Sequence, residues 1–315
     1  MGTTIEITGA PARGRAWARA LAVGVAAATL LMVFAGGAVT TLQAGDSEPT
    51  WSVRFWEWFR PWSELHGGHF YEMTHRQLGT VIGFLAVALA VVLWKGEPRT
   101  AVRVVGLAAL ALVIAQGVLG GLRVLVVFDP GVQSAAMKVT GAAEPLRLRA
   151  AAAMVHGALG HALFALMVAI ATVTSPRWFR DLHTVPRDAV AGTRRLAAIT
   201  VAVVFAQLIL GTYLRHAGWM TFAVIVHAAG ALLTALYAVL VAFQAGALGP
   251  AAGGIRRPAL FLALGVQAQV FLGVYSYVVP RALFMRTVHQ VAGSVLLALG
   301  VVLVLRARRH LRAIG

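Results

Sequence analysis

Long apolar runs recur along the chain and are separated by shorter polar segments. The runs cover residues 20–42, 73–94, 102–127, 150–173, 195–214, 219–243, 258–279 and 283–305. Each run has about the 20 residues that an α-helix needs to cross ~30 Å of hydrocarbon. The pattern therefore predicts an all-α, polytopic membrane protein with eight transmembrane helices.

Composition and charge support this prediction. Hydrophobic residues make up 59% of the 315 residues, and charged residues only 12%. The net charge of +16 would favour nucleic acid in a soluble chain, but the Arg residues lie between apolar runs and form no single face. We therefore expect membrane lipid around the chain and no nucleic acid. Cysteine is absent, which excludes disulfides and thiolate ligands.

The basic residues also predict the topology. An even number of spans puts both termini on one side, and most of the 27 Lys and Arg residues fall on that side. By the positive-inside rule, both termini are cytoplasmic in a multi-pass protein of the inner or plasma membrane. The expected parts are a cytoplasmic N-terminal segment 1–19, a four-helix bundle 20–173, a cytoplasmic linker 174–194, a second bundle 195–305 and a basic cytoplasmic tail 306–315.

Two outer loops are long, at about residues 43–72 and 128–149. The first is rich in aromatic residues, among them Trp51, Trp56, Trp58 and Trp62. Such a loop could cover a site below it, and aromatic residues that anchor the chain at the lipid headgroups would explain the composition equally well.

An internal repeat divides the chain into two halves. The motif Q-x-x-L-G stands at residues 116–120, 207–211 and 269–273, in the third, fifth and seventh spans. Each even span instead carries a histidine near its outer end: His75, His156, His227 and His289. The repeated motif and the recurring histidines predict two pseudo-symmetric four-helix bundles, related by an axis along the membrane normal, with two histidines in each.

Paired histidines on facing helices predict heme as a ligand. Two neutral imidazoles can hold one iron porphyrin between them, and helix bundles build cofactor sites from facing side chains. The alternative is that each histidine only bonds a neighbouring helix. Packing alone gives no reason for recurrence on every even span, so we favour heme.

Other polar residues are weaker candidates. His161 lies about 140° around the helix from His156 and is expected to bond another helix. His216 could touch a cofactor edge, whereas solvated or interfacial positions are expected for His66 and His69 in the outer loop, His183 in an inner loop and His310 in the tail. Five arginines near the outer level could pair with porphyrin propionates or extend to lipid headgroups: Arg76, Arg123, Arg215, Arg281 and Arg286.

The carboxylate of Glu72 lies one helical turn before His75. It could orient substrate or relay protons, or it could pair with Arg76 at i+4.

These motifs resemble the heme A synthase family. The likeness rests on E-x-x-H-R at residues 72–76, on the Q-x-x-L-G motifs and on the histidines of the even spans. The resemblance extends over nearly the whole chain. Many bacterial members carry cysteine pairs in outer loops, whereas this chain has no cysteine.

The resemblance implies an activity and a division of labour. Heme O would be oxidised at a ring methyl to give heme A for the terminal oxidase. His75 and His156 would flank the heme O substrate, Glu72 would assist catalysis, and His227 with His289 would bind heme b. Heme O synthase and cytochrome oxidase assembly factors would be the partners; the electron donor, the oxygen source and a homo-oligomeric state are left open.

Without the family resemblance, the residues leave two other functions open. A quinol-linked, diheme b-type electron-transfer subunit would show the same histidine pairs, with both hemes as permanent cofactors. A transporter with parallel repeats could use the histidines as a proton relay, but it would be expected to carry more intramembrane carboxylates.

Overall fold

The computed structural model describes residues 12–179, 183–218, 220–279 and 283–313. Within these ranges, eight helices are long and apolar enough to cross a membrane, which confirms the predicted all-α membrane fold. They are α1 (Ala12–Thr41), α2 (Gly67–Gly96), α3 (Thr100–Phe128), α5 (Pro145–Val173), α6 (Arg187–Ala217), α7 (Thr221–Ala247), α8 (Arg256–Val278) and α9 (Leu283–His310).

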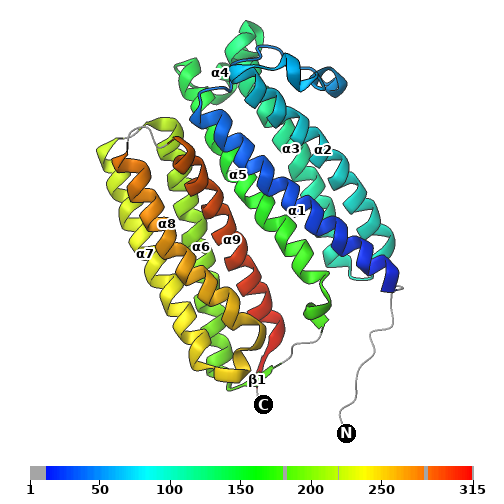
Figure 1. The fold of residues 1–315 in the computed structure, drawn as a ribbon, viewed down its shortest axis with the longest axis vertical. Coiled ribbons are helices and arrows are strands. Elements are labelled where there is room, and N and C mark those ends of the chain that lie inside the picture. The colour runs from blue at the N-terminus through cyan, green and yellow to red at the C-terminus, as the bar shows by residue number, and fades with distance from the viewer. Residues whose placement is uncertain (1–11, 180–182, 219, 280–282, 314–315) are drawn as a thin grey trace.

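The helices form two bundles of four that lie side by side (Figure 1). In the first bundle α1 packs on α2 and α5, and α3 packs on the same two helices. In the second bundle α6 packs on α7 and α9, and α8 packs on the same two helices. The bundles meet where α1 and α5 contact α9 and where α5 contacts α6. Helix α1 begins and α9 ends at the same end of the molecule; which side of the membrane this is stays a prediction.

Side-chain size explains how the bundles pack. Small residues such as Ala22, Ala86, Ala238 and Ala259 are buried in the two cores, which lets the helix backbones approach closely. Large apolar residues such as Phe243 are exposed on the outside. In a membrane this outer surface contacts lipid, so helices that are apolar all round are stable there.

The connections contain elements that the apolar runs do not predict. Helix α4 (Pro130–Thr140) lies in the connection between α3 and α5; Asp129 accepts a hydrogen bond from the Val132 N–H at its start, and Gly141 ends it with a φ of 69°. Short 3₁₀ turns occupy Phe55–Trp58, Trp62–Glu64, Pro176–Phe179 and Gly249–Ile255. The strands β1 (His183–Val185) and β2 (Leu311–Ala313) pair in parallel. Residues 311–313 of the predicted tail are therefore attached to the linker between the bundles.

Candidate functional site

The four predicted histidines come together as two pairs, one in each bundle. His75 on α2 and His156 on α5 have ring centroids 6.3 Å apart, with 69° between the ring planes. His227 on α7 and His289 on α9 have centroids 6.5 Å apart, with 67° between the planes. The two pairs therefore have nearly the same geometry, as a repeated four-helix unit requires.

This spacing fits an iron atom between the rings. Two imidazoles on opposite sides of one metal, each with a metal–nitrogen bond of about 2 Å, have centroids roughly 6–6.5 Å apart. Among the described residues, no three His, Cys, Asp or Glu side chains gather as they would around a bare metal ion. Two-ligand sites of this kind suit a porphyrin, which supplies the other four ligands itself.

The ring nitrogens differ in their surroundings. All four rings are half-buried. Nδ1 of His75, His156 and His289 is buried and finds no hydrogen-bond partner among the described residues, whereas Nδ1 of His227 lies 3.2 Å from Nε2 of Gln207. Because Nδ1 is enclosed by protein, Nε2 is the nitrogen left to face a ligand.

A glycine on the neighbouring helix makes room for each ring. A Cβ atom built on Gly36 or Gly273 would lie 3.0 Å from Cε1 of His75 or His289. The corresponding distances are 3.3 Å from Gly211 to His227 and 3.6 Å from Gly120 to His156. Three of these glycines end the Q-x-x-L-G motifs, so the repeat and the histidines belong to one structural unit.

The first pair faces a cavity of about 300 Å³. Both rings line it, and so does Glu72. Part of the wall comes from the second bundle, through Thr212, Arg215 and His216 of α6 and Gln290 of α9. The first site is therefore completed by both halves of the chain.

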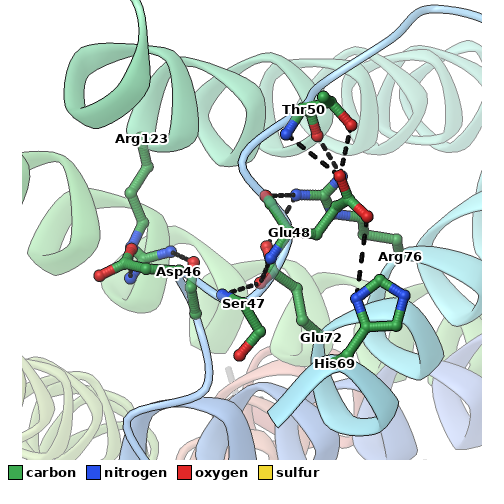
Figure 2. Close-up of polar contacts among 9 residues, drawn as sticks. Asp46, Ser47, Glu48, Thr50, His69, Glu72, Arg76 and Arg123 are labelled. Atoms are coloured by element: carbon green, nitrogen blue, oxygen red, sulfur yellow. Dashed lines mark hydrogen bonds and ion pairs between the residues drawn. The ribbon is translucent and has the colours of Figure 1, made fainter. Parts of the chain in front are cut away.

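The segment between α1 and α2 is held over this cavity by α2 side chains. Oε2 of Glu72 accepts hydrogen bonds from the backbone N–H groups of Ser47 (2.9 Å) and Glu48 (3.0 Å). Arg76 donates to the carbonyls of Thr50 (2.6 Å) and Glu48 (3.0 Å). Figure 2 shows both side chains extending from α2 to this backbone. We call residues 45–51 the cover segment.

Glu72 and Arg76 also pair with each other, at 2.7 Å between Oε1 and the guanidinium. Both side chains are nearly buried. The predicted i+4 ion pair is therefore confirmed, and the Glu72 carboxylate has three donors.

Helices α3 and α5 hold the other end of the cover segment. Arg123 donates to the Gly45 carbonyl at 2.7 Å and pairs with Asp46 (Figure 2). Arg149 pairs with the same carboxylate. Asp46 and Arg149 could not be predicted as site residues from the sequence, because their partners lie far away in the chain and no local motif marks them.

The aromatic loop lies partly over the cavity and partly on the surface. Trp51 and Trp58 line the cavity, and a Cβ on Gly121 would overlap the Trp51 indole. Trp56 and Trp62 are exposed, as interfacial anchors would be. The Trp62 indole N–H donates to Oε1 of Gln77 at 2.9 Å and so attaches the loop to α2.

Glu48 adds a titratable group to the cover segment. Burial raises the pKa of this carboxyl, but hydrogen bonds from the Thr50 hydroxyl and N–H, together with the charges of Arg76 and His69, outweigh burial and leave the pKa below its usual value. His69 lies 3.7 Å from the carboxylate. It is in the first turn of α2 and not in the outer loop where it was expected.

The remaining histidines take separate positions. His161 bonds Ser294 on α9 at 2.6 Å between Nδ1 and Oγ, which confirms the expected contact with another helix. His66 is exposed as predicted, and His183 is half-buried in β1. The prediction for His310 is wrong: it is only 1% exposed, because α9 continues beyond the apolar run and its ring packs 6.0 Å from that of Trp178.

Several of the proposed propionate partners already have protein contacts. Arg76 and Arg123 bind the cover segment, and Arg215 donates to the Gly37 carbonyl at 2.7 Å and to the Thr41 hydroxyl. Nε of Arg286 lies 3.4 Å from the Ser276 carbonyl. Arg281 lies outside the described residues.

A second cavity, of about 750 Å³, lies along the seam between α1 and α2. Its lining is mainly apolar and includes Phe34, Phe59, Phe70 and Leu78. Trp62 and Gln77 also line it, so the loop that covers the histidine site borders this cavity as well.

Comparison with known proteins places the chain in a family. A comparison with curated proteins finds no match. Residues 61–223, just over half of the chain, match the COX15-CtaA family of cytochrome oxidase assembly proteins. The matched region includes Glu72, His75 and His156 and ends shortly before His227. The chain therefore belongs to the COX15-CtaA family, the heme A synthase family.

Proposed function

We propose that the chain is a heme A synthase, which oxidises a ring methyl of heme O to a formyl group. The observation that carries this proposal is the two histidine pairs, with centroids 6.3 and 6.5 Å apart, in a chain of this family. In the proposal His75 and His156 flank heme O as substrate. His227 and His289 bind heme b as a cofactor.

The surroundings of the first pair support this assignment. The first pair faces a cavity closed by the cover segment, which three helices hold in place by side-chain contacts with its backbone and with Asp46. A substrate must enter and leave, and a closable cover keeps water from the reaction while the substrate is bound. A permanent cofactor needs no such cover.

Heme b, when bound, supplies one-electron transfer, and the protein binds and orients the two porphyrins. Glu72 lines the first cavity and holds the cover segment through two backbone N–H groups and Arg76. We therefore propose that Glu72 assists the reaction by holding this cover closed next to His75. Heme O synthase and oxidase assembly factors are the proposed proteins that deliver substrate and receive product.

Analysis of the bound hemes tests this function. The protein is purified from cells with and without a heme O supply, and its hemes are extracted and chromatographed. With heme O available, we expect heme b together with heme O, heme A or partly oxidised heme O. Finding only heme b in both preparations would contradict the proposal and favour the diheme electron-transfer subunit.

Single substitutions test the division of labour. His227→Ala or His289→Ala should remove bound heme b. His75→Ala, His156→Ala and Glu72→Ala should stop heme A formation while heme b stays bound. Unchanged heme A formation in the last three variants would refute the assignment.

A further inference from the structure

Three of the four paired histidines each accept a hydrogen bond, through the backbone carbonyl, from a glutamine on the neighbouring helix. Nε2 of Gln116 donates to the backbone carbonyl of His156 at 3.0 Å. Gln207 makes the same contact with His227 at 2.8 Å, and Gln269 with His289 at 2.7 Å. Each glutamine begins a Q-x-x-L-G motif, so the repeat places a donor one helical turn from the glycine that receives the ring.

Glycines on the histidine helices leave the space that the glutamine side chains occupy. A Cβ on Gly160 would lie 3.2 Å from Nε2 of Gln116, and a Cβ on Gly293 would lie 3.4 Å from Nε2 of Gln269. On Gly230 it would collide with the amide oxygen of Gln207. Each glutamine thus lies across a glycine and bonds the carbonyl of the histidine. We call this pair of contacts the glutamine clamp.

The first histidine lacks this donor. Met32 takes the place of the glutamine on α1, four residues before Gly36. Its Cε would lie 3.2 Å from a Cβ on Gly79, which is the contact that the glutamines make with their glycines. A thioether has no hydrogen to donate, so Met32 fills the space without bonding the His75 carbonyl.

The amide oxygens of the clamp indicate a role that involves a ligand. Among the described residues, the buried Oε1 atoms of Gln116, Gln207 and Gln269 find no hydrogen-bond partner. A histidine that binds iron through Nε2 carries its hydrogen on Nδ1, and metal-binding histidines usually donate that hydrogen to an acceptor. Nε2 of Gln207 lies 3.2 Å from Nδ1 of His227 and 2.8 Å from the His227 carbonyl, so this amide lies beside the ring as well as the backbone.

We propose that Gln116, Gln207 and Gln269 are positioning residues that hold the heme ligands His156, His227 and His289 in place. Met32 donates no such hydrogen bond, so His75 is the one ligand of the four that can move away from the iron. The second pair then has two clamped ligands and retains its heme. The first pair has one clamped and one unclamped ligand and exchanges its heme. The inference rests on the proposed function, since it concerns how the substrate site lets its heme leave.

Heme release is the measurement that follows most directly. Release breaks the iron–histidine bonds, and a ligand that is held in place rebinds faster than one that can move away. A hydrogen bond of ordinary strength corresponds to about a five- to tenfold change in such a rate. The wild-type chain with heme b in both sites should therefore transfer its hemes to apomyoglobin in a fast and a slow phase.

Two reciprocal substitutions separate the sites. Met32→Gln should slow the fast phase about five- to tenfold and leave the slow phase unchanged. Gln207→Met, at the corresponding position of the second bundle, should accelerate the slow phase by a similar factor and leave the fast phase unchanged. His75→Ala should remove the fast phase and His289→Ala the slow phase, which identifies each phase with its site.

Matched controls distinguish positioning from packing. Gln244→Met changes a glutamine at the other end of α7, where the amide is 3.5 Å from the Thr193 hydroxyl, and should leave both phases unchanged. Met32→Leu should also leave them unchanged, because leucine replaces one apolar side chain with another. The heme absorption spectrum and the thermal unfolding midpoint are recorded for each variant.

The outcomes are distinct. The clamp is refuted if Met32→Gln and Gln207→Met leave both phases unaltered, or if Gln244→Met accelerates release as much as Gln207→Met does. If Gln207→Met fails to fold, Gln269→Met tests the same phase. These rates do not depend on turnover: a chain that makes no heme A can still show the two phases, and a chain that makes heme A can still fail this test.

Discussion

The distance between a glycine and a histidine ring differs among the four sites, and this difference has measurable consequences. Gly36 and Gly273 leave 3.0 Å for a Cβ, which is less than ordinary van der Waals contact, whereas Gly120 leaves 3.6 Å. A methyl group at the closer positions must move the ring or the helix. At Gly120 it fits without movement.

Alanine substitutions should therefore have graded effects on heme binding. We expect Gly36→Ala and Gly273→Ala to lower the heme content of the purified protein and to alter its absorption spectrum, whereas Gly120→Ala has little effect. Gly24→Ala is the matched control on α1, because no atom lies within 4 Å of its Cβ. Equal losses of heme at Gly24, Gly120 and Gly273 would show that ring space does not decide binding.

The cover segment is the element whose position depends most on single side chains. Glu72 satisfies two of its backbone N–H groups, and Arg76 satisfies two of its carbonyls. Such backbone groups form no helix or strand bonds of their own here. Removing the carboxylate leaves both the N–H groups and the Arg76 guanidinium without that partner.

Glu72→Ala should open the cover segment without unfolding the helices. Loss of one member of a buried ion pair costs about 3–5 kcal/mol, so we expect faster amide hydrogen exchange at residues 45–51, measured by mass spectrometry. Glu72→Gln should have a smaller effect because an amide oxygen still accepts from the N–H groups. Glu57→Ala removes only an exposed ion pair with Arg54 and should change nothing; faster exchange there too would contradict this explanation.

The same elements show what a sequence can and cannot predict. Apolar length predicts the eight spans, because crossing the hydrocarbon requires about 20 residues of helix. The histidine pairs follow from recurrence at equal depth on the even spans. The contacts of Asp46 with Arg123 and Arg149 do not follow, since they depend on how α3, α5 and the cover segment are placed in space. Asp129-Pro130 and Gly141 do carry start and stop signals for α4, but apolar length alone does not detect so short a helix.

For the whole molecule, the contact between the bundles includes a buried polar pair. His161 is 2% exposed and Ser294 is fully buried, and they bond across the boundary between α5 and α9. A buried polar group that loses its partner costs about 1–3 kcal/mol, whereas replacing both members by apolar groups costs much less.

A double-mutant cycle tests this contact. We expect His161→Leu to lower the thermal unfolding midpoint in detergent. The Ser294 hydroxyl then still donates to the Gln290 carbonyl at 3.3 Å, so adding Ser294→Ala should cost less than Ser294→Ala costs alone. Heme b at His227 and His289 should stay bound in all three variants, because His161 lines the cavity of the first pair and does not belong to the second. Loss of this heme b without a change in the unfolding midpoint would instead make His161 part of the second site.

The second bundle contributes part of the wall of the first cavity, and we expect this shared wall to couple heme binding at the two sites. Thr212 follows Gly211, which receives the His227 ring, and Gln290 follows His289; both line the cavity of the first pair. Loading the second site should therefore tighten binding at the first by at least about fivefold, and the coupling must be reciprocal. Heme titrations of the first site in wild-type and His289→Ala protein measure it; equal affinities would mean that the two halves load independently, in either order.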